Sequence, residues 1–160
     1  MNIRLAEEPD LAELAALYQQ TILRHAPQHY SPAQTQAWAS FGENLDSFRH
    51  FIFDATTYVA IDETGIVGFA GIEANGHISA TYVRSDRLHQ GIGSALMRVL
   101  LDYAAAEHLT RLYAEASEFS LGLFQKFGFR LYGTEEVERS GVVFTRYLVE
   151  QNLLEQNAAP

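Results

Sequence analysis

The spacing of apolar residues changes from a helical period to a strand period near residue 57. Before that point, apolar residues three or four positions apart predict an amphipathic helix opened by Pro9 and Asp10. Its apolar positions are Leu11, Leu14, Ala15, Leu17, Tyr18 and Ile22. Ser31 followed by Pro32 predicts the start of a second helix, which carries Trp38. A third helix is predicted over residues 45–53.

Runs rich in β-branched and aromatic residues, bounded by turn residues, predict the strands. Residues 2–5 form a short first strand, and residues 57–61, 66–72 and 77–84 form three more. Asn75-Gly76 is a strong hairpin signal between the last two. A helix follows, with apolar positions Ile92, Ala95, Leu96, Val99, Leu100 and Tyr103. The rest predicts a strand over 111–116, a helix over 119–127 and a hairpin of residues 129–138 and 142–149.

This order of elements predicts an α/β (α+β) fold with a mixed, mostly antiparallel twisted sheet of about seven strands flanked by helices. The 160 residues, 48% of them hydrophobic, suffice for one core. We therefore expect a single domain over residues 1–150, with residues 151–160 as a loose C-terminal tail.

Charge and cysteine content narrow the classes of function. Twenty acidic against 11 basic residues, a net charge of −9, argue against nonspecific nucleic-acid binding, which needs clustered cations. The absence of cysteine excludes disulfides, thiolate metal sites and cysteine nucleophiles. No signal-peptide core and no apolar run near the ~20 residues that span a bilayer is present. These features predict a cytoplasmic protein without nucleic-acid or membrane partners.

The segment from His89 to Ser94 is the most informative motif. It lies between a predicted strand and a predicted helix, where helical N–H groups have no intrahelical partner and the helix dipole is positive. Gly91 and Gly93 allow close approach of an anion, so the turn predicts a pyrophosphate site. A tight connection without a ligand is the alternative. Neither the P-loop motif nor the Rossmann fingerprint matches.

Two motifs, residues 90–96 and residues 123–129, together with the order of elements resemble the GNAT superfamily of acyl-CoA-dependent N-acetyltransferases. The resemblance covers residues 2–150. His29-Tyr30-Ser31-Pro32 with Trp38 is also similar to a small bacterial subgroup of this superfamily. The resemblance implies a GNAT fold, acetyl-CoA as co-substrate and an amine acceptor. His25 and His29 have the spacing of a metal pair, but Pro27 between them spoils a helical presentation, so we expect no metal. Dimers are common in the superfamily, so a homodimer is an open alternative to a monomer.

The resemblance also implies roles for individual residues. The coenzyme A pyrophosphate is implied to be bound by the main chain of His89, Gln90, Gly91, Ile92, Gly93 and Ser94. Main-chain groups of Tyr82 and Val83, with Arg84 nearby, are implied to bind the pantetheine and the thioester carbonyl. Ser117 is implied to contact the coenzyme arm. Phe124 stands where many members carry the tyrosine that protonates the thiolate. Tyr113, Tyr132, Tyr147 or water remain as replacements, or the step needs no acid.

Acetyl transfer to an amine also needs a proton acceptor and a donor for the developing oxyanion. Glu73 and His77, which flank the predicted hairpin turn, are the candidate bases, and the carboxylates of residues 135–138 are the alternative. The N–H of Tyr82 or Val83 is the candidate oxyanion donor. Tyr30 and Trp38 are candidates for the substrate pocket, although core packing explains them equally well.

The sequence therefore predicts an N-acetyltransferase that acts on a small-molecule or peptide amine. Without cysteine an acetyl-cysteine intermediate is impossible, which favours direct attack in a ternary complex. A non-catalytic acyl-CoA-binding or sensing domain is the first alternative, motivated by Phe124, and a purely structural domain is the second.

Overall fold

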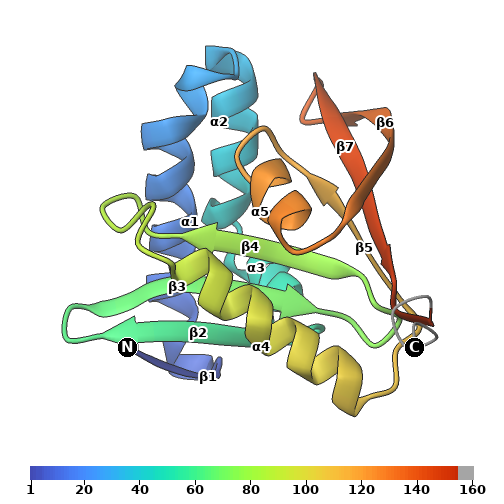
Figure 1. Ribbon diagram of the computed structural model, residues 1–160. Helices are drawn as coiled ribbons and strands as arrows, with labels where there is room; N and C mark the ends of the chain where they lie inside the picture. The colour runs from blue at the N-terminus through green and yellow to red at the C-terminus, as the bar shows by residue number, and fades with distance from the viewer. Residues whose placement is uncertain (155–160) are drawn as a thin grey trace.

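The computed structural model describes residues 1–154 and contains two sheets with helices around them (Figure 1). Before the first long strand come β1 (Asn2–Leu5), α1 (Leu11–His25), α2 (Pro32–Ser40) and α3 (Leu45–Phe53). Three 3-10 turns, Glu8–Asp10, Ala26–Gln28 and Phe41–Glu43, adjoin these helices. Then follow β2 (Thr56–Asp62), β3 (Gly65–Ile72), β4 (Ile78–Val83), α4 (Ile92–Ala106), β5 (Arg111–Ala116), α5 (Leu121–Lys126), β6 (Arg130–Arg139) and β7 (Val142–Asn152).

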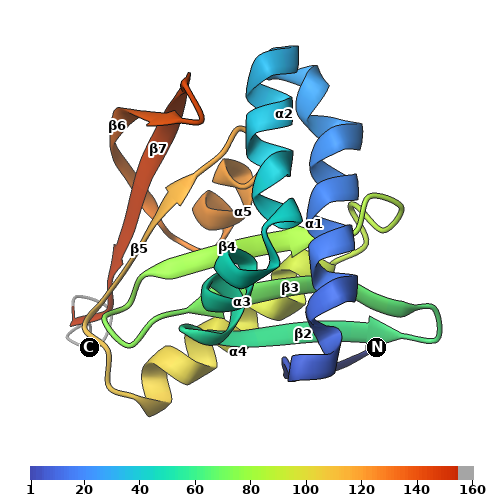
Figure 2. The ribbon, with the colours of Figure 1, turned by 180° about the vertical axis from the view of Figure 1, so that it is seen from behind.

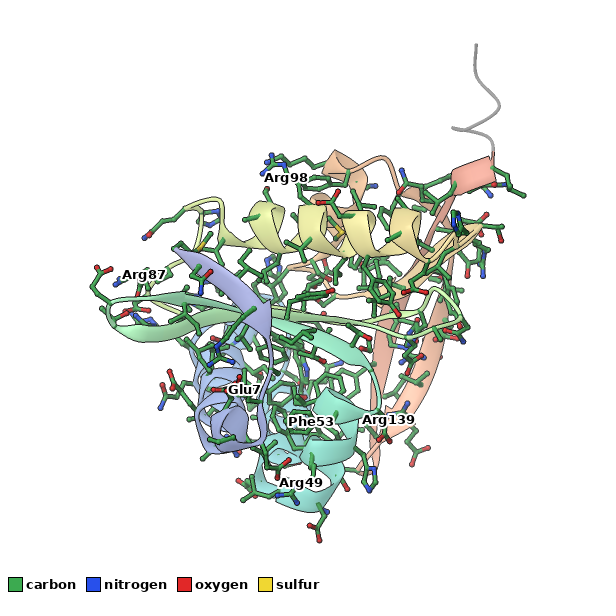
Figure 3. All side chains as sticks on the ribbon, turned by 90° about the horizontal axis from the view of Figure 1, so that it is seen from below. Glu7, Arg49, Phe53, Arg87, Arg98 and Arg139 are labelled. Atoms are coloured by element: carbon green, nitrogen blue, oxygen red, sulfur yellow. The ribbon has the colours of Figure 1, made fainter. Side chains whose placement is uncertain are left out.

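The first sheet is antiparallel, in the order β1-β2-β3-β4, and both of its faces are covered. Figure 3 shows Arg98 on α4 at one face and Arg49 on α3 at the other. One core cluster joins α4 to the sheet around Leu96, Met97 and Leu100, and the second joins α1 and α3 to it around Leu14 and Phe48. The fully buried strand β3 reads as an almost continuous apolar run for this reason.

The second sheet has the order β5-β7-β6, and it corrects the predicted C-terminal tail. Strand β7 continues to Asn152, and Gln151 is buried opposite Leu112. These polar residues extend the strand because β5 supplies a complete row of main-chain partners for them. The last part of the predicted tail, residues 155–160, lies outside the described residues.

Within residues 1–154, the strands of the two sheets are hydrogen-bonded to each other near one end, and buried side chains of both sheets, such as Val67 and Leu112, belong to one core cluster. Strands β4 and β5 meet at a single parallel bridge between His77 and Tyr113. Beside it, Tyr113 donates its N–H to the carbonyl of Gly76 (3.1 Å). A Cβ at Gly76, whose φ is +93°, would overlap the carbonyl oxygen of Arg111, so the turn packs directly against β5. From this joined end the strands separate toward their carboxyl ends, as Figures 1 and 2 show.

The predicted elements are confirmed, and besides the end of β7 two differences matter. The seven strands form two sheets rather than one continuous sheet. Helix α5 begins at Leu121, two residues later than predicted, because Ser117 organises the preceding turn. The Ser117 hydroxyl oxygen accepts the N–H groups of Phe119 (3.2 Å) and Ser120 (3.1 Å), which keeps these residues out of the helix.

Candidate active site

A cleft of about 1480 Å³ lies where β4 and β5 separate. One side is formed by the turn before α4 and by α5, and the other by the first helices and the β6–β7 hairpin. The cleft brings together most of the predicted site residues, which are Tyr30, Trp38, Glu73, His77, Tyr82, Val83, His89, Gly91, Ile92, Gly93, Ser94, Ser117 and Phe124.

The turn before α4 presents main-chain N–H groups to the cleft. His89 and Gly91 both have positive φ, +60° and +83°, and Gly91 is the N-cap of the helix. The first intrahelical bond runs from the Ala95 N–H to the Gly91 carbonyl (3.0 Å), so the N–H groups just before Ala95 have no helical partner. A Cβ on Gly93 would lie 3.3 Å from Leu123 and narrow this cradle. The geometry fits a bound phosphate group.

A positive charge reaches the same turn from α5. Lys126, the only lysine of the chain, donates from Nζ to Ser94 Oγ at 2.8 Å. Ser94 lies in the first turn of α4 and is buried. The sequence did not predict this contact, because the two residues lie 32 positions apart along the chain. An ammonium group at a helix N-terminus strengthens the case for an anionic ligand there.

The register of β4 distinguishes Val83 from Tyr82. Arg84 donates its N–H to the carbonyl of Val67 in β3 (2.8 Å). Antiparallel partners alternate, so Tyr82, two residues earlier, also directs its N–H to β3. Val83 lies between them and turns its main-chain groups away from β3, and its carbonyl accepts from Thr21 Oγ1 (3.1 Å). Val83, rather than Tyr82, therefore offers its N–H to the cleft.

The side chains of two residues predicted at the coenzyme site do not border the cleft. Arg84 donates to Asp86 (2.6 Å), which borders the cleft, and to Thr64 (2.8 Å), which does not, and these bonds hold its guanidinium away. The Gln90 side chain is exposed on the turn, so only its main chain remains for the predicted role.

A charged cluster lies on the cleft near the joined end of β4 and β5. His77 Nδ1 lies 2.8 Å from Glu73 Oε2, and His77 Nε2 lies 2.8 Å from Glu115 Oε2. Because ionised carboxylates only accept hydrogen bonds, this geometry fits the imidazolium form, in which both ring nitrogens donate. The hydrogen bond to Glu115 accordingly raises the pKa of His77, and the same bond lowers the pKa of Glu115.

The cluster continues to β7 through Arg146. Its guanidinium lies 3.8 Å from Glu115 Oε1 and donates from Nε to Glu135 Oε1 at 2.9 Å. Glu115 therefore has cationic partners on two sides, whereas Glu73 keeps 42% of its side chain exposed and binds His77 through one oxygen. Of the predicted bases, His77 has no free lone pair, and Glu73 is the residue open to an acceptor.

An aromatic wall formed by Tyr30, Trp38, Tyr82, Phe119 and Phe144 lines the cleft beyond the charged cluster. The rings of Tyr30 and Trp38 lie 5.3 Å apart, edge to face, and Trp38 Nε1 donates to the Tyr82 hydroxyl at 3.2 Å. Burial raises the pKa of Tyr82 to about 12. Tyr30 and Trp38 both pack against the core cluster of α1 and α3, and both also border the cleft. Each side chain therefore contributes to the core and lines the pocket.

Ser117, predicted at the coenzyme arm, follows the carboxyl end of β5, and Phe124 lies on α5. Phe124 is 2% exposed and packs its ring edge to face against Phe129 at 5.1 Å, so its ring belongs to the core and borders the cleft. The three tyrosines considered as replacements lie outside the cleft. Tyr113 binds Asn75 (3.0 Å), Tyr132 lies over Arg111, and Tyr147 donates to Glu118 Oε1 (2.6 Å).

Comparison with known proteins identifies the family. The family model described as "Acetyltransferase (GNAT) domain" matches residues 26–151, and the chain belongs to this family. The chain is 27% identical to "Uncharacterized N-acetyltransferase YafP" of Escherichia coli, over 92% of this chain and 93% of that protein. It is 28% identical to "Peptidyl-lysine N-acetyltransferase YjaB" of the same organism, over 88% and 90%.

Solved structures agree with the family. A GCN5-related N-acetyltransferase from Rhodopseudomonas palustris superposes with a TM-score of 0.90 at 25% identity, covering 94% of each chain. The PaiA N-acetyltransferase from Thermoplasma acidophilum, solved with coenzyme A, shares the fold with a TM-score of 0.74 at 14% identity, covering 95% of this chain and 99% of that one. The protein is thus an acetyl-CoA-dependent acyltransferase of the N-acetyltransferase class, and its fold is the GNAT fold that the sequence predicted.

Within residues 1–154, no group of three or more His, Cys, Asp or Glu side chains is arranged to hold a metal ion. His25 and His29, spaced like a metal pair, point to different partners, Ser85 and Phe119. No helix in the same range is long and apolar enough to cross a bilayer.

Proposed function

We propose that the protein transfers an acetyl group from acetyl-CoA to a primary amine of a small molecule or peptide, by direct attack in a ternary complex. The observation that carries the proposal is the placement of two unlike groups on one cleft. The main-chain cradle of residues 89–94 follows the carboxyl end of β4, and the cluster of Glu73, His77 and Glu115 lies at the amino end of that strand. A donor and an acceptor bound from the two ends of the cleft would meet along β4.

The residues of the cradle fit the coenzyme. The N–H groups of Ile92, Gly93 and Ser94, with Lys126 beside them, would hold the pyrophosphate. The coenzyme would supply an acetyl thioester, whose carbonyl carbon the amine attacks. Val83 would donate its N–H to the carbonyl oxygen as negative charge develops there, an interaction worth about 3–4 kcal/mol for a well-placed donor. Ser117 would contact the coenzyme arm from the end of β5.

Glu73 is the proposed proton acceptor for the incoming ammonium. Its exposed side chain borders the cleft, and the His77 imidazolium holds its Oε2 in place. His77 therefore acts as a positioning residue rather than as the base, because both ring nitrogens already carry protons. The carboxylates of residues 135–138 are the weaker alternative, since Glu135 is paired with Arg146.

The name of one relative, "Peptidyl-lysine N-acetyltransferase YjaB", supports an amino group on an alkyl chain as the acceptor. Four rings of the aromatic wall, those of Tyr30, Trp38, Phe119 and Phe144, support an acceptor with an apolar portion. Aromatic faces pack against alkyl chains and attract ammonium groups. A cytoplasmic location and a single domain over residues 1–150 belong to the same proposal, as does a homodimer, which sedimentation at several concentrations tests.

A non-catalytic acyl-CoA sensor is the second candidate, and the buried Phe124 favours it because phenylalanine has no proton to donate. The deciding experiment incubates the protein with acetyl-CoA and a panel of alkylamines, amino acids, aminoglycosides and lysine peptides. Free thiol is expected with at least one amine, with initial-rate lines that intersect as a ternary complex requires. Calorimetric binding of coenzyme A without thiol release from any amine would instead identify a sensor, and no binding would identify a structural domain.

A further inference from the structure

Tyr30 lies at the junction that leads into α2, directly before the helix cap. It follows the 3-10 turn Ala26–Gln28 and stands next to Ser31, the N-cap of α2. The capping box between Ser31 and Gln34 fixes this junction, and Gln34 Nε2 donates to the carbonyl of Val143 in β7 at 2.9 Å. The backbone that carries Tyr30 is therefore tied to the opposite wall of the cleft.

The phenol ring extends from this junction to the end of β5. Trp38, Phe119 and Phe144 surround the ring at centroid distances of 5.3, 6.1 and 6.3 Å. At its far end, the Tyr30 oxygen accepts the main-chain N–H of Glu118 at 3.0 Å, and the Ser117 hydroxyl interacts with the same oxygen. The ring thus places its hydroxyl beside the residues at which the coenzyme arm is proposed to pass.

The hydroxyl keeps its own proton available. Its oxygen is used as an acceptor, and among the described residues no bond is found in which Tyr30 is the donor. Burial is the largest influence on the phenol and raises the pKa of Tyr30, so the group stays protonated at neutral pH. The ionisable groups that face it are the Glu118 carboxylate, Tyr147 on β7, Tyr82 behind Trp38, and His29, which packs on Phe119.

Resting on the proposed function, we propose that Tyr30 is the general acid that protonates the departing coenzyme thiolate, delivered from the α2 junction because Phe124 on α5 has no proton to give. The amine nitrogen forms a bond to the acetyl carbon, the carbon–sulfur bond breaks, and its electron pair goes to sulfur. The Tyr30 proton moves to that sulfur and yields the free thiol. The phenolate regains a proton from water, and the protons released by the ammonium leave through Glu73.

The test compares Tyr30→Phe with Tyr147→Phe. Both variants delete one phenolic oxygen that contacts Glu118, but only Tyr30 borders the cleft. Tyr30→Phe is expected to lower kcat at least about tenfold, the low end for a general acid, with parental affinity for acetyl-CoA by calorimetry. Tyr147→Phe is expected to keep the parental kcat.

A second readout does not depend on turnover. A phenol that donates to sulfur stabilises the thiolate, so the thiol of bound coenzyme A should titrate below free coenzyme A in the parent and in Tyr147→Phe. In Tyr30→Phe the titration should move back up, as followed by the ultraviolet absorbance of the thiolate. The titration of the parent needs no variant and tests the inference even if Tyr30→Phe does not fold.

The inference is overturned if Tyr30→Phe retains the parental kcat, if Tyr147→Phe loses as much activity, or if the bound thiol of the parent titrates no lower than the free thiol. Failure of the proposed function has a different signature, since the parent itself would then release no thiol with any amine.

Discussion

The two sides of the cleft are built in different ways. On the α4 side, the proposed coenzyme cradle consists of main-chain groups from six consecutive residues, 89–94, whose shape depends on Gly91 at φ +83°. On the proposed acceptor side, the groups are side chains from distant segments, such as His77 and Glu115, which lie 38 positions apart. A main-chain site requires only local conformation, whereas a side-chain site requires the whole fold to be correct.

This difference explains what each side can specify. A helix N-terminus with glycines binds a phosphate almost regardless of the neighbouring side chains, so one cradle can serve many enzymes with one coenzyme. The aromatic wall and the charged cluster can change residue by residue without disturbing the cradle. We infer that donor binding and acceptor choice can vary independently in this protein, and the following predictions test that separation.

The largest effect is expected at the cradle. Gly91→Val should weaken coenzyme A binding at least about thirtyfold, roughly 2 kcal/mol, because an L-residue resists φ +83° and the turn must reshape. Gly141→Val is the matched control, since Gly141 has φ +75° in the β6–β7 turn and also has free space around its Cβ position. Calorimetry and thermal unfolding should show similar losses of stability but parental binding in the control. Equal binding by Gly91→Val would refute the cradle.

On the acceptor side, Glu73→Gln should lower kcat at least about tenfold while coenzyme A binding stays parental. The amide keeps the shape of the side chain but cannot accept a proton at neutral pH. Glu63→Gln, in the exposed turn between β2 and β3, is the control and should keep full activity. A parental kcat and pH profile in Glu73→Gln would place the base elsewhere.

Phe124→Tyr tests whether an acid on α5 could act in the cleft. Because the ring is buried against Phe129, the added hydroxyl should destabilise the fold by about 1–3 kcal/mol without raising turnover. Chemical unfolding of Phe124→Tyr and of Phe119→Tyr, whose ring is exposed, measures the difference. A stable variant with higher kcat would show that an acid on α5 suits this cleft.

Lys126→Gln should weaken coenzyme A binding by only about two- to fivefold, because the ammonium is exposed and screened by salt. Binding isotherms at low and high salt should converge for parent and variant, since the lost contribution is electrostatic. Arg130→Gln removes an exposed positive charge outside the cleft and should leave both isotherms parental.

The smallest effect concerns pH and stability. The pKa of His77 is raised by Glu115, so its stabilising charge is fully present below the ordinary pKa of about 6.5 and is lost as pH rises through the raised value. The free energy of unfolding of the parent should fall across that window, and His77→Gln should flatten the fall. His50→Gln, in an exposed pair with Asp54, is the control and should retain the parental slope.

Local signals in the sequence predicted the elements and the cradle. The Ser31 cap, the apolar period of α4 and the glycines of the turn each act within a few residues, so they can be read directly. The division into two sheets could not be read, because no local pattern marks the end of pairing between β4 and β5. The polar end of β7 was mistaken for a tail, since its partners in β5 lie about 40 residues earlier.

Side-chain chemistry was harder to predict than main-chain chemistry. Glu73 and His77 were identified because they flank a turn, but Glu115 resembles any solvent-facing residue of an alternating strand. Its role follows only from the docking of the β3–β4 turn on β5, which brings Glu115 to the ring of His77. Because both ring nitrogens face carboxylates, the role that we propose for His77 is positioning Glu73 rather than accepting the proton itself.

The hydrogen-bonded junction between the sheets, at Gly76 and Tyr113, has a consequence for how long the protein survives. Beyond this junction β4 and β5 separate, and a donor seated in the cleft would contact elements of both sheets. The free energy of unfolding would then rise with the concentration of the acyl donor, by roughly 2.7 kcal/mol at a hundred times its dissociation constant. The lifetime of the protein against proteolysis would therefore follow the acetyl-CoA level of its surroundings.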